Sequence, residues 1–191
     1  MANLKPNFIV GIGGSAGGLI AYIELLDALP PNTGMAFVIV SHILPTANSQ
    51  LALILARHTI MPVSVTSSGI PIKANYVYVC PPNADLFIEN NTFKVISPRL
   101  RGNVQVDIFL SSLADAMGTR AVGIILSGYD GDGAEGCRRI RAKGGTVFAQ
   151  DASAEVQGMS LSAQATGCVD HVLPPRKIPD ELKKLVKASE K

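Results

Sequence analysis

A glycine-rich segment near the N-terminus (residues 11–18, GIGGSAGG) separates a short apolar run from an amphipathic stretch. It fits two motifs. Gly11, Gly13 and Ala16 match G-x-G-x-x-G/A, a motif in which backbone N–H groups at the start of a helix face a pyrophosphate. Gly13, Ser15 and Gly17 match G-x-S-x-G, the sharp turn that exposes a serine nucleophile. Neither motif is specific alone, and a tight turn without a ligand is the third interpretation.

The residues that follow favour the serine. A dinucleotide site needs a carboxylate at the end of the second strand, about 20 residues on, but that predicted strand ends in Ser41-His42. A serine nucleophile needs a base, and His42 ends a strand at the same sheet edge as Ser15, where open α/β sheets bind ligands. His58 follows an arginine at a predicted helix end, and His171 lies in an apolar strand. We expect structural roles for these two.

Two carboxylates, Asp130 and Asp132, follow the strand over 121–126 and also belong to that edge. Such a pair can hold a divalent metal or cap a helix, but a magnesium site gathers a further carboxylate or phosphate, and the sequence offers no clear candidate. The sequence therefore predicts a triad of Ser15, His42 and either Asp130 or Asp132, in which the histidine takes the serine proton and the aspartate orients the histidine. From the residues we therefore expect no metal site.

Short apolar runs alternate with segments of helical period, which is typical of a parallel sheet covered on both faces. We predict an α/β fold: a doubly wound, mostly parallel sheet with helices on both faces and an inserted antiparallel β-hairpin. The expected strands are 8–10, 35–40, 63–65, 76–79, 121–126, 146–149 and 169–173, and the hairpin pairs 86–88 with 93–96. The expected helices are 19–26, a segment capped by Asn48 or Ser49 and running to Leu55, 106–117, 134–142, 161–166 and 179–187.

Composition narrows the class of protein. The 191 residues suit a single domain over 1–191, and 47% hydrophobic residues exclude a disordered chain. Seventeen basic against fifteen acidic residues give +2, without the field of a nucleic-acid binder, and the basic residues after Pro175 fit the solvated face of a last helix. Three cysteines without C-x-x-C spacing suit a reduced compartment, and no apolar run approaches a membrane span. We expect a cytoplasmic protein.

Several blocks in one order carry a resemblance that covers nearly the whole chain, from Phe8 to Leu173. The sequence resembles the catalytic domain of the CheB-type protein-glutamate methylesterases of bacterial chemotaxis. The blocks are 10–18 (VGIGGSAGG), 40–45 (VSHILP), 79–82 (VCPP), 106–114 (VDIFLSSLA), 126–136 (LSGYDGDGAEG), 149–151 (AQD) and 158–159 (GM).

The resemblance implies Ser15 as nucleophile and His42 as base, and it selects Asp132 over Asp130 because the family's aspartate directly precedes Gly-Ala. It implies hydrolysis of γ-glutamyl methyl esters on the cytoplasmic helices of chemoreceptors, deamidation of certain glutamines, and no cofactor. With it comes the expectation of oxyanion stabilisation by backbone N–H groups around Ala16 and Tyr129, and of a separate response-regulator or signalling partner.

The sequence departs from the family pattern at three places. Ala16 stands where a hydroxyl residue is usual, so a side-chain donor to the oxyanion is missing. Tyr129-Asp130 replaces the usual Met-Gly pair, and the added carboxylate can repel an acidic substrate or raise the pKa of a neighbour. The receiver domain of the best-known members is not found before Gly11. The first two departures favour a competing function, a catalytically weak module that binds receptors or partners. A third possible function is nucleotide binding at the glycine loop.

Overall fold

The computed structural model describes residues 5–42 and 50–189. Nine strands are assigned in that part of the chain: β1 (Ile9–Gly14), β2 (Ala36–Ser41), β3 (Val63–Val65), β4 (Tyr76–Val79), β5 (Asp85–Glu89), β6 (Thr92–Ile96), β7 (Ala121–Ile125), β8 (Thr146–Gln150) and β9 (His171–Leu173). The α-helices are α1 (Gly18–Ala28), α2 (Leu51–Leu55), α3 (Gln105–Met117), α4 (Ala134–Ala142), α5 (Gly158–Ala165) and α6 (Ile178–Ser189).

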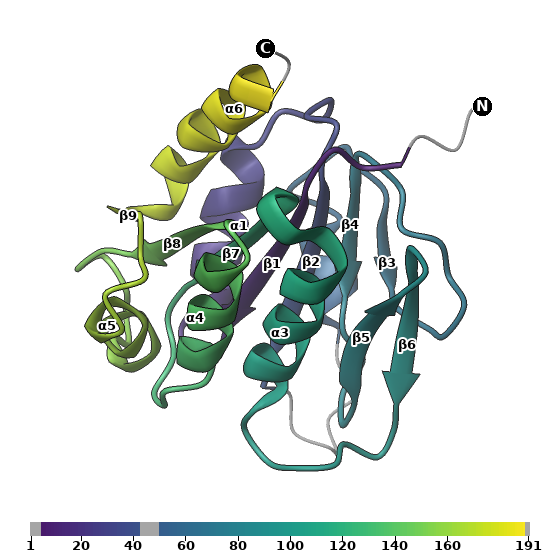
Figure 1. Cartoon of the computed structure of the whole chain (residues 1–191), viewed down its shortest axis with the longest axis horizontal. Helices are drawn as coiled ribbons and strands as arrows, with labels where there is room; N and C mark the ends of the chain where they lie inside the picture. The colour runs from purple at the N-terminus through teal and green to yellow at the C-terminus, as the bar shows by residue number, and fades with distance from the viewer. Residues whose placement is uncertain (1–4, 43–49, 190–191) are drawn as a thin grey trace.

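Seven strands form one parallel sheet in the order β3-β4-β2-β1-β7-β8-β9, and β5 and β6 form a separate antiparallel hairpin (Figure 1). From β1 the chain first builds the sheet toward β2 and β4, and later returns to the other side of β1 with β7. The reversal places a topological switch point between β1 and β7, where loops diverge at the carboxyl ends of the strands. The predicted fold class is confirmed.

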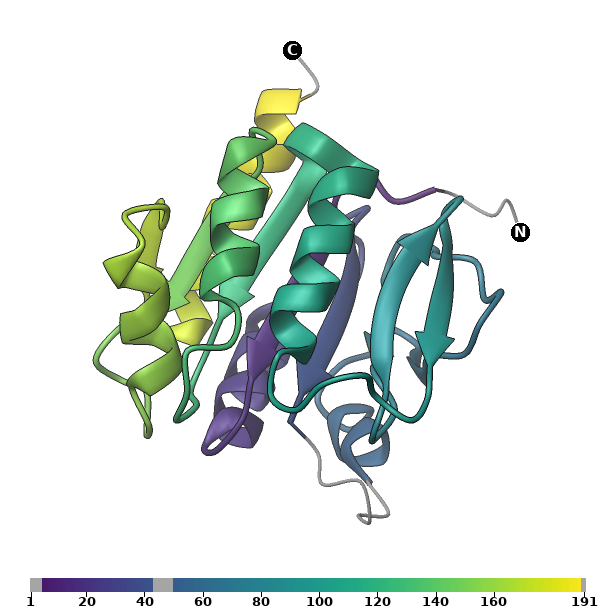
Figure 2. The ribbon, with the colours of Figure 1, turned by 60° about the horizontal axis from the view of Figure 1, so that its bottom comes forward.

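The two faces of the sheet are covered by different helices (Figure 2). On one face, β-strand side chains pack with α3, α4 and α5 and with the hairpin, through buried residues such as Phe109, Ile140 and Phe93. On the other face they pack with α1, α2 and α6, through residues such as Leu25, Leu55 and Leu182. Burial on both faces explains why the central strands are continuously apolar.

β1 is longer than the sequence predicts, because the expected loop after residue 10 begins only after Gly14. Gly11 pairs with Val38 of β2 on one side and Gly123 of β7 on the other, so the glycines belong to the central strand. A Cβ atom on Gly13 would lie 2.4 Å from Val106 Cγ1 of α3. Glycine here lets α3 approach the sheet closely, at the edge where the candidate site lies.

The remaining differences concern element ends. α5 begins at Gly158, earlier than predicted, and β9 begins at His171. The cap at Asn48 or Ser49 lies outside the described residues. The predicted hairpin turn is formed by Asn90 and Asn91, whose φ angles of 50° and 61° are tolerated by asparagine.

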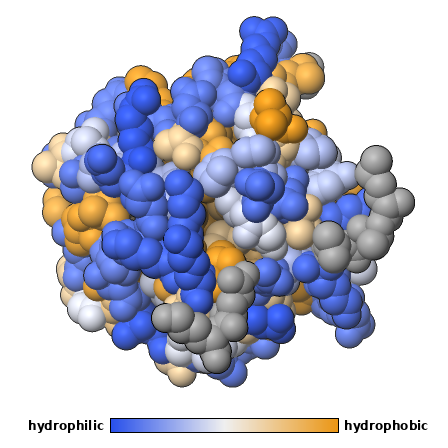
Figure 3. Space-filling model, turned by 90° about the horizontal axis from the view of Figure 1, so that it is seen from above, coloured by the Kyte–Doolittle hydropathy of each residue, from blue (hydrophilic) through white to orange (hydrophobic). Residues whose placement is uncertain are grey.

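The face of the molecule seen from above shows mainly hydrophilic residues with scattered hydrophobic ones (Figure 3). It lies opposite the carboxyl ends of the strands. Over residues 5–42 and 50–189, no helix has the length and apolarity needed to cross a membrane.

Candidate active site

Ser15 lies in the turn between β1 and α1. Its backbone N–H donates to the carbonyl oxygen of Ser127 at 2.8 Å, and its own carbonyl accepts from the N–H of Gly18 at 2.9 Å, at the first turn of α1. Gly17 has φ of 72°, and a Cβ atom there would lie 2.6 Å from Ser127 Oγ. The turn therefore needs glycine at position 17 both for its backbone angle and for space.

Ser127, which follows β7, fastens this turn to the next loop. Its hydroxyl donates to the carbonyl of Ala16 at 2.7 Å and accepts from the N–H of Val156 at 3.0 Å, and the side chain of Ser127 is fully buried. The N–H of Ser127 in turn donates to Gln150 Oε1 at 3.1 Å. Sequence reasoning gave Ser127 no role, since its partners lie 29 and 111 residues away in the chain.

His42 directly follows β2, at the same edge of the sheet as Ser15. Strands β1 and β2 are in parallel register, with Gly14 opposite Ser41. Ser15 and His42 directly follow this last pair. Neighbouring strands lie about 4.8 Å apart, so the two residues leave the sheet side by side. The imidazole is 8% exposed, and its Nε2 lies 2.6 Å from Asp132 Oδ2. Since Asp132 engages Nε2, Nδ1 is the ring nitrogen left for a further partner.

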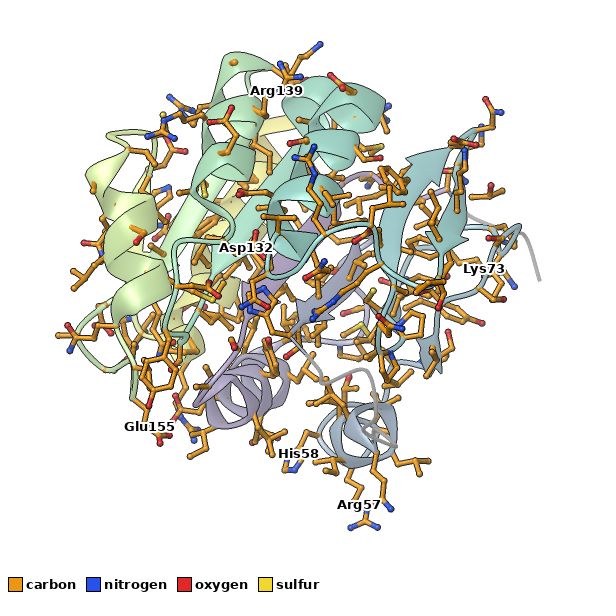
Figure 4. All side chains as sticks on the ribbon, turned by 90° about the horizontal axis from the view of Figure 1, so that it is seen from below. Arg57, His58, Lys73, Asp132, Arg139 and Glu155 are labelled. Carbon is orange, nitrogen blue, oxygen red and sulfur yellow. The ribbon has the colours of Figure 1, made fainter. Side chains whose placement is uncertain are left out.

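Asp132 is the best-held carboxylate of the site. Its side chain is fully buried, and besides His42 it accepts hydrogen bonds from two backbone N–H groups in the first turn of α3, Val106 at 2.9 Å and Asp107 at 2.8 Å. These three contacts fix the carboxylate of Asp132 in position beside the imidazole. Figure 4 shows Asp132 near the centre of this edge, whereas Arg57, His58 and Glu155 lie at its rim.

Asp107, whose N–H donates to Asp132, links α3 to α4 through its side chain. Its Oδ1 accepts from the N–H of Gly136 in the first turn of α4, at 2.8 Å. Burial raises the pKa of Asp107, with the charge of Asp132 adding to the shift and the hydrogen bond from Gly136 opposing it. An acidic residue at the start of a predicted helix can be recognised in the sequence. Its partner in α4 cannot.

Asp130 contacts the same imidazole from the other side, with Oδ2 at 3.4 Å from His42 Nδ1. Burial alone lowers the pKa of His42, but the hydrogen bond and charge of Asp132, together with the charge of Asp130, outweigh it and raise the pKa. Arg99, which follows the hairpin, opposes this rise. The sequence offered Asp130 and Asp132 as alternatives, and the structure brings both to His42.

Two backbone donors are available for a developing oxyanion. The N–H groups of Ala16 and Tyr129 donate to no acceptor among residues 5–42 and 50–189. A Cβ atom on Gly128 would lie 3.2 Å from Ser15 Cβ, so the loop that carries Tyr129 passes directly beside Ser15. The positions are those at which an oxyanion hole is expected, although Ala16 adds no side-chain donor.

A groove of about 1090 Å³ lies between α3 and the hairpin, lined among others by Ile88, Leu100, Arg101 and Ser112. Its lining includes Asp107 but not Ser15, His42 or Asp132. The groove is therefore separate from the sheet edge at which the candidate residues converge.

The other histidines and the buried cysteines have structural surroundings. His58 Nδ1 lies 3.0 Å from Asp27 Oδ1, and His171 stacks on Phe148 with ring centroids 4.9 Å apart. Burial raises the pKa of the thiols of Cys80 and Cys137 to about 12, so neither is a thiolate nucleophile near neutral pH.

Comparison with known proteins points to one family. Residues 10–182 match the family model described as CheB methylesterase. A protein-glutamate methylesterase/protein-glutamine glutaminase of Saccharophagus degradans is 30% identical over 87% of this chain, and one of Anaeromyxobacter dehalogenans is 34% identical over 94% of it. The chain spans about half the length of these relatives, 47% and 53% respectively. The crystal structure of the Thermotoga maritima CheB methylesterase catalytic domain matches with a TM-score of 0.85 at 30% identity, covering 93% of this chain and 98% of that one.

Proposed function

Because the chain belongs to the CheB methylesterase family, we propose that it is a serine hydrolase that removes methyl esters from glutamate side chains of proteins. The observation that carries this proposal is the contact between His42 Nε2 and Asp132 Oδ2 at 2.6 Å, with Ser15 directly after the neighbouring strand β1. A buried carboxylate that orients a histidine beside a serine is the arrangement that activates a serine nucleophile.

The geometry supports the following sequence of steps. Ser15 Oγ attacks the ester carbonyl while its proton passes to Nδ1 of His42, and Asp132 stabilises the imidazolium through Nε2. The negative oxygen of the tetrahedral intermediate accepts hydrogen bonds from the backbone N–H groups of Ala16 and Tyr129. His42 then gives its proton to the methoxy oxygen, and methanol leaves an acyl-enzyme on Ser15.

Water completes the reaction. It attacks the acyl carbonyl while His42 takes a proton, and the proton returns to Ser15 Oγ as the glutamate carboxylate is released. The same steps on a glutamine side chain release ammonia, which would account for the paired names of the relatives. Each proton acceptor and oxyanion donor in this scheme belongs to the chain itself.

The family supports a protein substrate, the methylated cytoplasmic helices of a chemoreceptor, and therefore a cytoplasmic location. It also supports a separate response-regulator or signalling partner that would regulate the enzyme. We propose this substrate, this location and this kind of partner for the chain, with residues 1–191 acting as one catalytic domain.

Methanol release from a methylated receptor fragment tests the function. We expect release by the wild-type protein and a loss of at least about 10³-fold in Ser15→Ala, since the nucleophile is removed. Ser67→Ala is a matched control, because Ser67 is exposed and its hydroxyl makes no hydrogen bond within the described residues. Equal release by the wild type and Ser15→Ala would contradict the proposal. Absence of release from both would favour the binding-module interpretation.

A further inference from the structure

The imidazole of His42 has a carboxylate at each of its two nitrogens. Asp132 Oδ2 lies 2.6 Å from Nε2, within hydrogen-bond distance, and Asp130 Oδ2 lies 3.4 Å from Nδ1, within ion-pair distance. A neutral imidazole carries one N–H, whereas the imidazolium carries two. Only the imidazolium can therefore present an N–H to both carboxylates at once.

The two carboxylates are held differently. Asp132 is fully buried and accepts from two backbone N–H groups of α3, so it has no freedom to leave Nε2. Asp130 is 35% exposed, and its Oδ1 accepts from the N–H of Asp132 at 3.1 Å, which keeps Oδ2 turned toward the ring. The exposed member of the pair is the one at the nitrogen that must accept the proton of Ser15.

We propose that Asp130 is a positioning residue that keeps His42 protonated at Nδ1 in the free enzyme and has to give up that nitrogen before Ser15 can be activated. The inference rests on the proposed function for its consequence in catalysis. It adds a regulatory group to the triad: Asp130 competes with the nucleophile for the base, and its partial exposure lets a bound substrate displace it.

Few other charges face the ring. Asp130 and Asp132 belong to the loop between β7 and α4, and Arg99 reaches the site from the segment between β6 and α3, where its charge lowers the pKa of His42. Asp107, the acidic residue in the first turn of α3, directs its side chain to Gly136. The sequence of residues 43–49 contains no titratable side chain. The raised pKa of His42 agrees with two facing carboxylates that outweigh burial and one cation.

A titration of His42 in the substrate-free protein, followed by NMR of its ring, tests the inference without any assay of activity. The chain has three histidines, so a His42→Gln spectrum identifies the signal. We expect Asp130→Asn and Asp130→Ala to lower the midpoint by about half a unit to one unit, because each removes a negative charge beside Nδ1. Glu135→Gln is the matched control: this carboxylate is exposed, pairs with Arg138 and does not face His42.

The pH dependence of kcat/KM for methyl ester hydrolysis supplies the second readout. In Asp130→Asn we expect its acidic limb to move down by the same amount as the NMR midpoint. One unit below the wild-type midpoint, that shift makes the variant about 2.5 to 5.5 times faster than the wild type. A residue with a merely structural role would change the rate at every pH and leave the limb in place.

Each outcome decides the inference. A midpoint in Asp130→Asn within about 0.2 unit of the wild type would overturn it, and so would a shifted midpoint with an unmoved acidic limb. If no variant hydrolyses the ester, the proposed function fails while the NMR midpoint still decides whether Asp130 holds the proton on His42. If the ester is hydrolysed and the midpoint does not move, only the present inference fails.

Discussion

Asp132 and Asp107 each accept hydrogen bonds from the first turn of the other's helix. Asp132, two residues before α4, accepts from the N–H groups of Val106 and Asp107 at the start of α3, and Asp107 accepts from Gly136 at the start of α4. Two helix N-termini thus share two carboxylates, and one of these carboxylates also holds the imidazole. The packing of α3 on α4 and the orientation of His42 therefore depend on the same carboxylate, Asp132.

Replacement of Asp132 by asparagine tests that link. In the asparagine, one of the two carboxylate oxygens is replaced by an NH₂ group, which cannot accept a hydrogen bond. This NH₂ group must face either a backbone N–H of α3 or His42. We expect kcat to fall by about 10³- to 10⁴-fold, because the imidazole loses its anionic partner. We also expect a loss of about 1–3 kcal/mol in unfolding free energy, measured by urea titration, from the buried unmatched donors. Unchanged stability together with a large loss in kcat would separate the two roles and contradict the shared arrangement.

Asp107 provides a pH prediction. Burial raises its pKa in the folded protein above the ordinary value of about 3.9, so in the window between the two values the folded state binds more protons than the unfolded state. The contribution of Asp107 to stability therefore falls as pH rises through that window. We expect Asp107→Asn, which keeps the acceptor for Gly136, to flatten this fall.

The comparison variant is Asp107→Ala, which removes the acceptor as well. We expect it to cost about 1–2 kcal/mol more than Asp107→Asn at every pH, because the N–H of Gly136 loses its partner. Urea unfolding at several pH values between about 3.5 and 6.5 measures both effects. Equal pH slopes in the wild type and Asp107→Asn would show that Asp107 does not carry the dependence.

The turn that holds the nucleophile predicts a contrast between two glycines. Gly17 and Gly167 have almost equal φ angles, 72° and 70°, but a Cβ atom on Gly17 would meet Ser127 Oγ at 2.6 Å, whereas one on Gly167 would meet nothing within 4 Å. We expect Gly167→Ala to cost about 1 kcal/mol from backbone strain alone and to leave hydrolysis intact. Gly17→Ala should cost at least about 1 kcal/mol more and lower kcat by at least about tenfold, since the clash displaces the turn of Ser15. Similar losses in both variants would show that strain, and not the contact with Ser127, fixes the turn.

Much of this site could be predicted from the sequence, because parallel strands bring their carboxyl ends to one edge. That rule predicts that Ser15, His42 and the Asp130–Asp132 pair lie together. It could not choose between the two aspartates, which are two residues apart on one loop. The structure shows that both contact His42, one buried and one exposed.

The residues that hold the site in place could not be predicted from sequence patterns. Ser127 and Asp107 act through partners 29 to 111 residues away in the chain, and no local propensity reports such contacts. The extension of β1 to Gly14 was missed for a related reason. Glycine normally interrupts a strand, but here it makes room for Val106 of α3, and tertiary packing overrides the local preference.

Labelling with a fluorophosphonate, followed by mass spectrometry of the intact protein and its peptides, tests whether Ser15 is an activated nucleophile. We expect one adduct on the wild-type protein, located at Ser15, with no adduct in Ser15→Ala and labelling slowed by at least about 10²-fold in His42→Gln. The exposed Ser67 should stay unlabelled in every variant. A folded wild-type protein that forms no adduct at Ser15, or that is labelled equally fast without His42, would contradict the assignment of this edge as a serine hydrolase site.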